Sequence, residues 1–141
     1  MSSYQVDQID HVELFVPNRR IAAEWYEQVL GLQVAKAFAS WADDQDGPLM
    51  IATRSGGTKL ALFEGEPRGE RLTTGFHRVA FRVDRASFEA FCRHVQSNPV
   101  CDELGEELRE LTVVDHGLAI SVYFCDPYGH RLEVTTYEVG T

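Results

Sequence analysis

The chain has 141 residues and a formal net charge of −9, because 22 acidic residues outnumber 13 Lys and Arg. This length fits a single domain that can bury a core without disulfide or metal staples. The acidic balance argues against a nucleic-acid partner, which would be bound through clustered Lys and Arg. No apolar run reaches the roughly 18 residues that span a bilayer, and the first residues do not resemble a secretory signal. We therefore expect neither nucleic acid nor membrane as a partner.

The chain has three cysteines, Cys92, Cys101 and Cys125, which is an odd number, and no two of them form a Cys-x-x-Cys motif. We expect reduced, mostly buried thiols in a cytoplasmic protein, and neither a disulfide framework nor a zinc ribbon. The sequence also lacks a Gly-x-Gly-x-x-Gly segment, a P-loop and a Gly-x-Ser-x-Gly elbow. We therefore expect no nucleotide cofactor.

A weak internal repeat organises the chain. Residues 11–16 and 78–83, offset by 67 residues (83 − 16 = 67), both alternate with a period of two, which predicts half-buried strands. A helix is expected after each strand, the first between Asn18 and Gly31 and the second between Asp84 and Asn98. Their predicted buried stripes are Ile21, Ala22, Trp25 and Val29 in the first helix, and Phe88, Phe91, Cys92 and Val95 in the second.

Three strand signals follow each helix. They lie at 32–41, 49–53 and 59–63 in the first copy, and within 107–114, 119–125 and 131–137 in the second. The pattern predicts an α+β fold of two tandem βαβββ modules in one domain, 1–141. Module one covers about 7–64, a linker about 65–74, and module two about 75–138. Two such sheets would form a cup around a cavity, with the helices outside, and this cavity would be the ligand site.

Two segments carry a resemblance to a known family. They are His-Val-Glu-Leu-Phe-Val with Trp-Tyr-Glu-Gln-Val-Leu-Gly-Leu (11–16, 25–32), and Tyr-Phe-Cys-Asp-Pro-Tyr-Gly-His-Arg-Leu-Glu-Val (123–134). They resemble the vicinal oxygen chelate superfamily, which includes glyoxalase I, extradiol dioxygenases, fosfomycin-resistance proteins, methylmalonyl-CoA epimerase and bleomycin-resistance proteins. The resemblance covers about residues 9–138. It implies the paired βαβββ fold but no particular reaction, because the members share a fold and differ in chemistry.

The resemblance also implies positions for metal ligands. Metal-dependent members take ligands from the first and last strands of each module, and these positions match His11 and Glu133. Ala61 occupies a fourth position, so a four-ligand site is excluded and a three-ligand site remains. In module two the family pattern places the third ligand at Arg78, which is not a ligand type, and His77 lies one residue earlier.

Two interpretations follow, because a shift of one residue moves a side chain to the other face of a strand. A β-bulge could turn His77 inward, so that His11, His77 and Glu133 hold one divalent metal (Fe, Mn, Ni or Zn) as a Lewis acid. With a regular strand, Arg78 points inward and pairs with Glu133 or Glu13, and the site is metal-free.

Other side chains are candidates for contacts with a ligand. Glu13 is a candidate general base or a partner for a cationic ligand, or it forms an ion pair with Arg78 or Arg82. Tyr123 resembles a substrate-contacting tyrosine of fosfomycin-type and extradiol members, or it packs in the core. Trp41, expected on a strand, lines the ligand groove or packs. We expect His116 and His130 to be turn residues near the surface.

Three functions remain open from the sequence. The first is a metal-dependent lyase, isomerase or dioxygenase acting on a small oxygen-rich molecule. The second is metal-free sequestration of a small, cationic drug, as in the bleomycin-resistance proteins, which the net charge and Glu13 favour. The third is metal-free catalysis, with Glu13 or His11 as base and Arg78 stabilising an oxyanion. Fosfomycin is a poor first guess, because Glu13 stands where those enzymes carry Thr. Exposed strand edges predict a homodimer.

Overall fold

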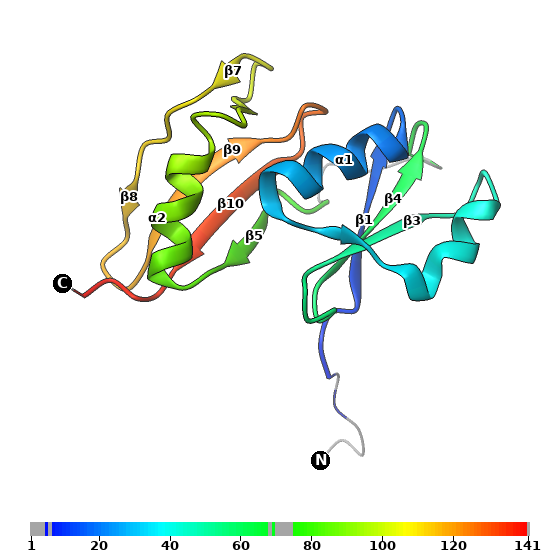
Figure 1. The fold of residues 1–141 in the computed structure, drawn as a ribbon, viewed down its shortest axis with the longest axis horizontal. Coiled ribbons are helices and arrows are strands. Elements are labelled where there is room, and N and C mark those ends of the chain that lie inside the picture. The colour runs from blue at the N-terminus through cyan, green and yellow to red at the C-terminus, as the bar shows by residue number, and fades with distance from the viewer. Residues whose placement is uncertain (1–4, 6, 68, 70–74, 141) are drawn as a thin grey trace. The chain divides into compact units, whose positions relative to one another are not determined.

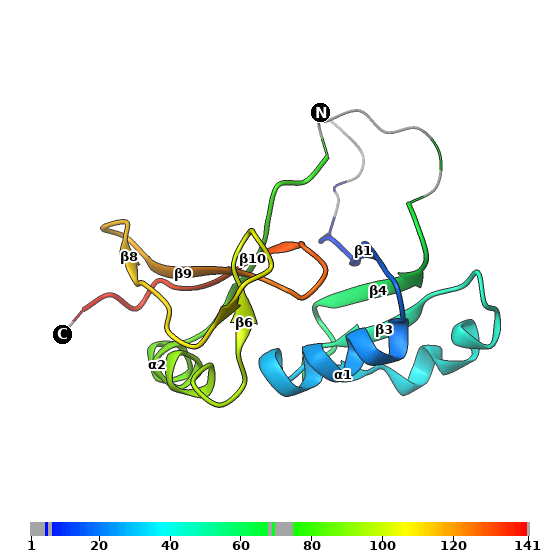
Figure 2. The ribbon, with the colours of Figure 1, turned by 90° about the horizontal axis from the view of Figure 1, so that it is seen from above.

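The computed structural model describes residues 5, 7–67, 69 and 75–140 (Figure 1). The chain divides into two compact units, Met1–Gly69 and Glu70–Thr141. In each unit a helix covers one face of a sheet (Figure 2), so the α+β class predicted from the sequence is confirmed. The predicted linker falls partly outside the described residues, and the closing of the two sheets into a cup stays a prediction. In the described part of the chain, no helix is long and apolar enough to cross a membrane.

The first unit is a four-stranded sheet with one α-helix. Its strands are ordered β1-β4-β3-β2, with β1 parallel to β4 and the other neighbours antiparallel. Leu14 and Val16 of β1 are 2% and 1% exposed and belong to the face that the helix covers. The elements are β1 (His11–Val16), α1 (Arg19–Leu30), β2 (Gln33–Val34), a 3-10 helix η1 (Lys36–Asp43), β3 (Leu49–Ala52) and β4 (Lys59–Glu64).

Helix α1 begins and ends where the sequence predicts. The Asn18 side chain accepts hydrogen bonds from two backbone N–H groups of the first turn, and Gly31 takes a left-handed conformation with φ of 73°. The predicted buried stripe is partly wrong, because Ile21 is 58% exposed and Tyr26 is fully buried. The predicted stripe and the buried one, which is Ala22, Ala23, Tyr26 and Val29, both have helical spacing. Only packing against the sheet decides which of them faces inward.

The strand predicted over 32–41 is wrong in most of its length. Strand β2 has two residues, and η1 follows it. The buried guanidinium of Arg19, at the start of α1, donates to the carbonyl oxygens of Ala42 and Gly47, both at 2.6 Å. The Arg19 side chain thus satisfies carbonyl groups at the end of η1 and in the turn after it. The apolar pattern of residues 32–41 could not reveal this contact, because Arg19 belongs to another element.

The second unit repeats the plan of the first with short additional strands. Its order is β5-β10-β9-β6-β7, with β8 also paired to β9. Strand β5 is parallel to β10, as β1 is to β4, which supports the internal repeat. The elements are β5 (Val79–Arg82), α2 (Arg85–His94), β6 (Val100–Cys101), β7 (Glu107–Leu108), β8 (Val114–Asp115), β9 (Ile120–Cys125) and β10 (Arg131–Thr136).

The predictions for the middle of the second unit need correction. Helix α2 ends at His94, before the predicted Asn98, because the backbone amides of Gln96 and Ser97 bond to carbonyls three residues back instead of four. Strand β6 was not predicted from the sequence, and β7 and β8 take the place of the strand predicted within 107–114. Two-residue strands are too short to show alternation, and a turn in which Asp102 accepts two backbone N–H groups joins β6 to β7.

Candidate functional site

Three of the predicted site residues lie on one face of the second sheet. In the register, Glu133 on β10 is directly opposite Tyr123 on β9 and next to Ala80 on β5. Side chains at paired positions point to the same face. The other face carries buried residues, and Phe124 stacks there on Phe91 of α2, with ring centroids 5.3 Å apart. The face with Tyr123 and Glu133 is therefore the one that α2 leaves uncovered.

Arg78 lies on this same face. Its guanidinium carbon is 4.7 Å from the centroid of the Tyr123 ring, a cation–π contact. The Arg78 Nε atom is buried and has no hydrogen-bond partner among the described residues. The stacking stabilises the cation, but it leaves a buried N–H donor available for an acceptor group.

Tyr123 also contacts a histidine that the sequence analysis treated as a solvated turn residue. The Tyr123 hydroxyl is 2.7 Å from His116 Nε2, and the two rings meet edge to face at 86°. His116 follows β8, and the β8–β9 hairpin folds it back over the strand that carries Tyr123. The register of β8 against β9 places His116 beside Ala119, so the predicted strands alone would not have suggested the contact with Tyr123. We call Arg78, His116, Ser121, Tyr123 and Glu133 the Tyr123 cluster.

Glu133 is held by buried hydroxyl groups. Ser121 Oγ is 2.7 Å from a carboxylate oxygen of Glu133 and 2.8 Å from Thr135 Oγ1. Thr135 in turn donates to the Ile120 carbonyl at 3.1 Å. Ser121 is only 1% exposed, so its buried hydroxyl fixes one oxygen of the carboxylate from a neighbouring position on the same face.

His77 does not share this arrangement. It precedes β5, is exposed, and its Nδ1 lies 3.4 Å from Arg131 Nη1. The described pairing of β5 with β10 runs from Val79 to Arg82 without a bulge. Arg78, and not His77, is therefore the residue beside Tyr123.

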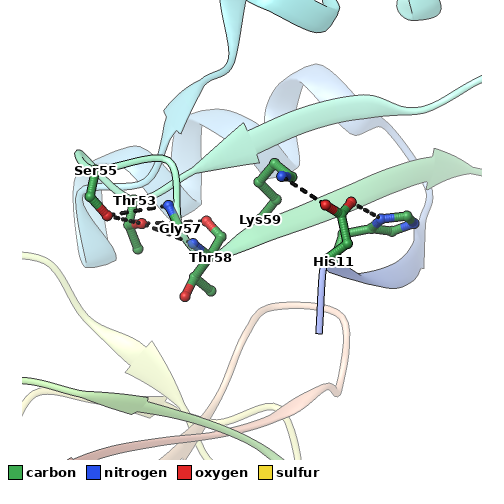
Figure 3. Close-up of polar contacts among 7 residues, drawn as sticks. His11, Thr53, Ser55, Gly57, Thr58 and Lys59 are labelled. Atoms are coloured by element: carbon green, nitrogen blue, oxygen red, sulfur yellow. Dashed lines mark hydrogen bonds and ion pairs between the residues drawn. The ribbon is translucent and has the colours of Figure 1, made fainter. Parts of the chain in front are cut away.

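His11 lies in the first unit, within a charged cluster. Its Nδ1 is 2.8 Å from an Asp10 oxygen, and Lys59 Nζ is 3.1 Å from the other Asp10 oxygen (Figure 3). Its Nε2 is 3.3 Å from a Glu13 oxygen. The hydrogen bond that His11 donates to Asp10, with a smaller effect of Glu13, raises the pKa of His11 despite partial burial. The hydrogen bonds with His11 and Lys59 lower the pKa of Asp10. Both changes favour a charged His11–Asp10 pair.

The two units carry the same cross-strand pair with its residues exchanged. On β1 and β4, Glu13 is in register with Ala61, whereas on β5 and β10, Ala80 is in register with Glu133. Each unit therefore has one carboxylate at this pair of positions, on the first strand in the first unit and on the last strand in the second. Ala61, which excludes a fourth ligand, thus lies next to Glu13 on the neighbouring strand.

Trp41 and His130 lie in surroundings that the sequence analysis did not predict. Trp41 is in η1, 48% exposed, with its ring 4.7 Å from that of Phe38. His130 Nδ1 is 2.7 Å from an Asp126 oxygen, and the Asp126 side chain is fully buried and also accepts two backbone N–H groups. The Asp-Pro-x-Gly segment is therefore a structural turn, and it places β9 against β10.

Within either unit, the described residues bring no three His, Cys, Asp or Glu side chains together as a potential metal site. The predicted ligands His11, His77 and Glu133 are divided between the two units. The three-ligand site therefore stays a prediction.

Two units that each pair a first strand in parallel with a last strand, with a helix on one face, define a fold of tandem βαβββ modules. The model of the Glyoxalase/Bleomycin resistance protein/Dioxygenase superfamily matches residues 8–134, and the chain belongs to this superfamily. A comparison with curated protein sequences finds no match.

Solved structures with the same fold have low sequence identity to this chain. A glyoxalase/dioxygenase from Nostoc punctiforme has 20% identity and a TM-score of 0.63, covering 97% of this chain and 98% of that one. A mutant of the fosfomycin resistance protein FosX from Listeria monocytogenes, complexed with Mn(II) and 1S,2S-dihydroxypropylphosphonic acid, has 15% identity and a TM-score of 0.66, covering 96% and 95%. At such identities the likeness shows the fold alone.

Proposed function

We propose that this protein binds a small, oxygen-rich, anionic molecule at the Tyr123 cluster, without a metal ion. The observation that carries the proposal is the position of Arg78. Its guanidinium lies over Tyr123, on the face that carries Glu133, at the place where metal-dependent relatives are expected to hold their third ligand. A fixed cation there supplies the positive charge that an oxyanion needs.

The donors of the cluster suit an oxygen-rich ligand. Arg78 keeps its buried Nε–H donor without a protein partner among the described residues. When His116 carries its proton on Nε2, it donates to the phenol oxygen of Tyr123, and the Tyr123 O–H can then donate to the ligand. A carboxylate or a pair of vicinal oxygens could accept from both Arg78 and Tyr123.

The residues at the expected metal positions fit a divalent cation poorly. A metal ion beside the Arg78 guanidinium would be repelled by it. Both ring nitrogens of His11 already face carboxylate oxygens, of Asp10 and Glu13, so each nitrogen would have to leave its partner to coordinate a metal. A metal-dependent lyase, isomerase or dioxygenase is therefore the second candidate, favoured by the position of Glu133 alone.

Sequestration of a cationic drug has less support at this face. The Arg78 guanidinium would repel a cationic ligand brought to Tyr123. The net charge of −9 describes the chain as a whole and does not outweigh a cation in direct contact with the ligand.

The proposal is tested with oxalate, a dianion with vicinal oxygens, and catechol as probes in calorimetry. The protein is purified without chelator, its metal content is measured, and the titrations are repeated with EDTA and after loading with Mn²⁺ or Fe²⁺. Arg78→Gln is compared with Arg82→Gln, which makes the same charge change at an exposed position on the same face.

We expect less than about 0.1 metal ion per chain, since tight sites normally retain metal. We also expect oxalate binding that EDTA does not change, weakened about tenfold or more by R78Q and little by R82Q. Binding that appears only after metal loading supports the metal-dependent candidate instead. Equal effects of the two variants, or no binding of either probe, would contradict the proposal.

A further inference from the structure

Two of the three cysteines are direct neighbours in the second sheet. Cys101 on β6 is in register with Cys125 on β9, in an antiparallel pair. Opposed residues in such a pair have Cα atoms about 4.5 or 5.5 Å apart, and their side chains share a face. Disulfides join residues with Cα atoms roughly 4.4–6.8 Å apart. The backbone therefore already meets the spacing that a bridge requires, although both thiols are free.

We propose that Cys101 and Cys125 form a reversible disulfide when the protein meets a peroxide. The Cys101 thiol loses its proton, and the thiolate attacks one oxygen of hydrogen peroxide. The O–O bond breaks, and the departing hydroxide takes up that proton, so the products are a sulfenic acid and water. The Cys125 sulfur then attacks the Cys101 sulfur and displaces hydroxide, which takes the Cys125 thiol proton and leaves as a second water molecule. In total, two thiols are oxidised by two electrons and one peroxide is reduced to two water molecules.

The burial of the two sulfurs assigns these roles. Cys101 is partly exposed, whereas Cys125 is only 2% exposed. An oxidant in solution therefore reaches Cys101 first, and Cys125 lies behind it as the resolving thiol. Cys101 is also among the groups that raise the pKa of Cys125, which agrees with their proximity.

The surroundings make the reaction slow at neutral pH and faster in base. Burial raises the pKa of both thiols, and Asp126 and Asp102 raise that of Cys101 further. The thiolate is the reactive form, so its fraction and the rate of oxidation increase with pH. The pair is thus stable as thiols under reducing conditions and responds to sustained oxidant.

The bridge would act next to the Tyr123 cluster. Cys125 is two residues from Tyr123 on β9, on the same face, and in register with Arg131 of β10. A disulfide would tie the short strand β6 to the central strand β9. It would close a loop between residues 24 positions apart (125 − 101 = 24), which restricts the unfolded chain.

The test uses the full chain treated with hydrogen peroxide at pH 7 and pH 8.5. Remaining thiols are alkylated, and the products are analysed by intact mass and by peptide mapping without reduction. Cys92, on α2, is the internal control, because it lies on another element of the same unit. The variants are Cys92→Ser, Cys101→Ser and Cys125→Ser.

We expect the mass of the protein to fall by two hydrogens. We also expect peptide mapping to find a linked pair of peptides that contain Cys101 and Cys125. The link should form faster at pH 8.5 than at pH 7, and dithiothreitol should reverse it. C92S should behave like the parent chain, and C101S should give no intramolecular link. The oxidised protein should melt about 5 °C or more above the reduced one. Sulfinic acid at Cys101 without a link, a link through Cys92, or only intermolecular dimers would overturn the proposal. The mapping of the parent chain decides between these outcomes even if a variant fails to fold.

Discussion

The Arg78 guanidinium and the Tyr123 ring form a cation–π pair, with 4.7 Å between the guanidinium carbon and the ring centroid. Arg78 immediately precedes β5, Tyr123 lies on β9, and strand β10 lies between β5 and β9 in the sheet. The pair therefore spans the strand that carries Glu133. A cation and a phenol are held on either side of one carboxylate, which gives the face both donors and an acceptor.

Replacing Tyr123 with Phe tests the role of the phenol. The ring and its contact with Arg78 remain, but the hydroxyl next to His116 is lost. We expect oxalate binding to weaken about threefold to tenfold, because one neutral hydrogen bond contributes about 0.5–1.5 kcal/mol. Calorimetry measures the affinity, with Tyr137→Phe, an exposed tyrosine, as the control. Unchanged affinity in Y123F would show that the hydroxyl does not contact the ligand.

Removing the Arg19 side chain should destabilise the first unit. Its guanidinium donates to the carbonyl oxygens of Ala42, Gly47 and Asp44, and Arg19→Met leaves these acceptors without that partner. We expect a loss of about 2–4 kcal/mol in the free energy of unfolding, measured with urea. Arg20→Met, at an exposed position of the same helix turn, should change it by less than about 0.5 kcal/mol. Similar losses in both variants would mean that the η1 contacts contribute little.

The Asp10→Asn variant should lower the pKa of His11. The hydrogen bond that His11 donates to the Asp10 carboxylate is the largest cause of the raised pKa, and an amide cannot stabilise the imidazolium in the same way. NMR titration of the histidine ring protons measures this, with Asp7→Asn as the control for a nearby charge. An unchanged His11 pKa in D10N would contradict the contact.

The same pair gives a pH dependence of stability with a defined sign. His11 has a raised pKa, so its contribution is complete below the ordinary value of 6.5 and is lost as pH rises through the folded pKa. Asp10 has a lowered pKa, so its contribution is complete above 3.8 and is lost as pH falls through the folded pKa. The stability difference between the parent chain and D10N should therefore be greatest between these two values. Urea unfolding across pH 3–9 tests it, and a difference independent of pH would contradict it.

Asp126 and Asp115 allow a matched comparison of two turns. Each accepts a backbone N–H two residues further on, but Asp126 is fully buried and also holds His130, whereas Asp115 is exposed. We expect Asp126→Ala to destabilise the fold by about 3 kcal/mol and Asp115→Ala by about 1 kcal/mol or less, as measured by urea unfolding. Equal losses would show that burial of the first carboxylate is not what holds the β9–β10 turn.

Local patterns in the sequence determined a large part of the fold. Strand signals in 11–16, 119–125 and 131–137 predicted three long strands, which the structure has at His11–Val16, Ile120–Cys125 and Arg131–Thr136. Asn18 and Gly31 fixed both ends of α1. These signals succeed because pleat, helical period and capping each depend on residues close together in the chain. The internal repeat and the family followed from the same local patterns.

Tertiary structure alone decided the arrangement of the candidate site. His77 and Arg78 are adjacent in the chain, and only the tertiary structure shows that Arg78 is the one that lies beside Tyr123. The contact of His116 with Tyr123 depends on how a hairpin folds back, and η1 depends on a side chain from α1. Strand register and long-range hydrogen bonds join residues that are far apart in the sequence. They are set by tertiary packing, so a pattern within a short segment cannot predict them.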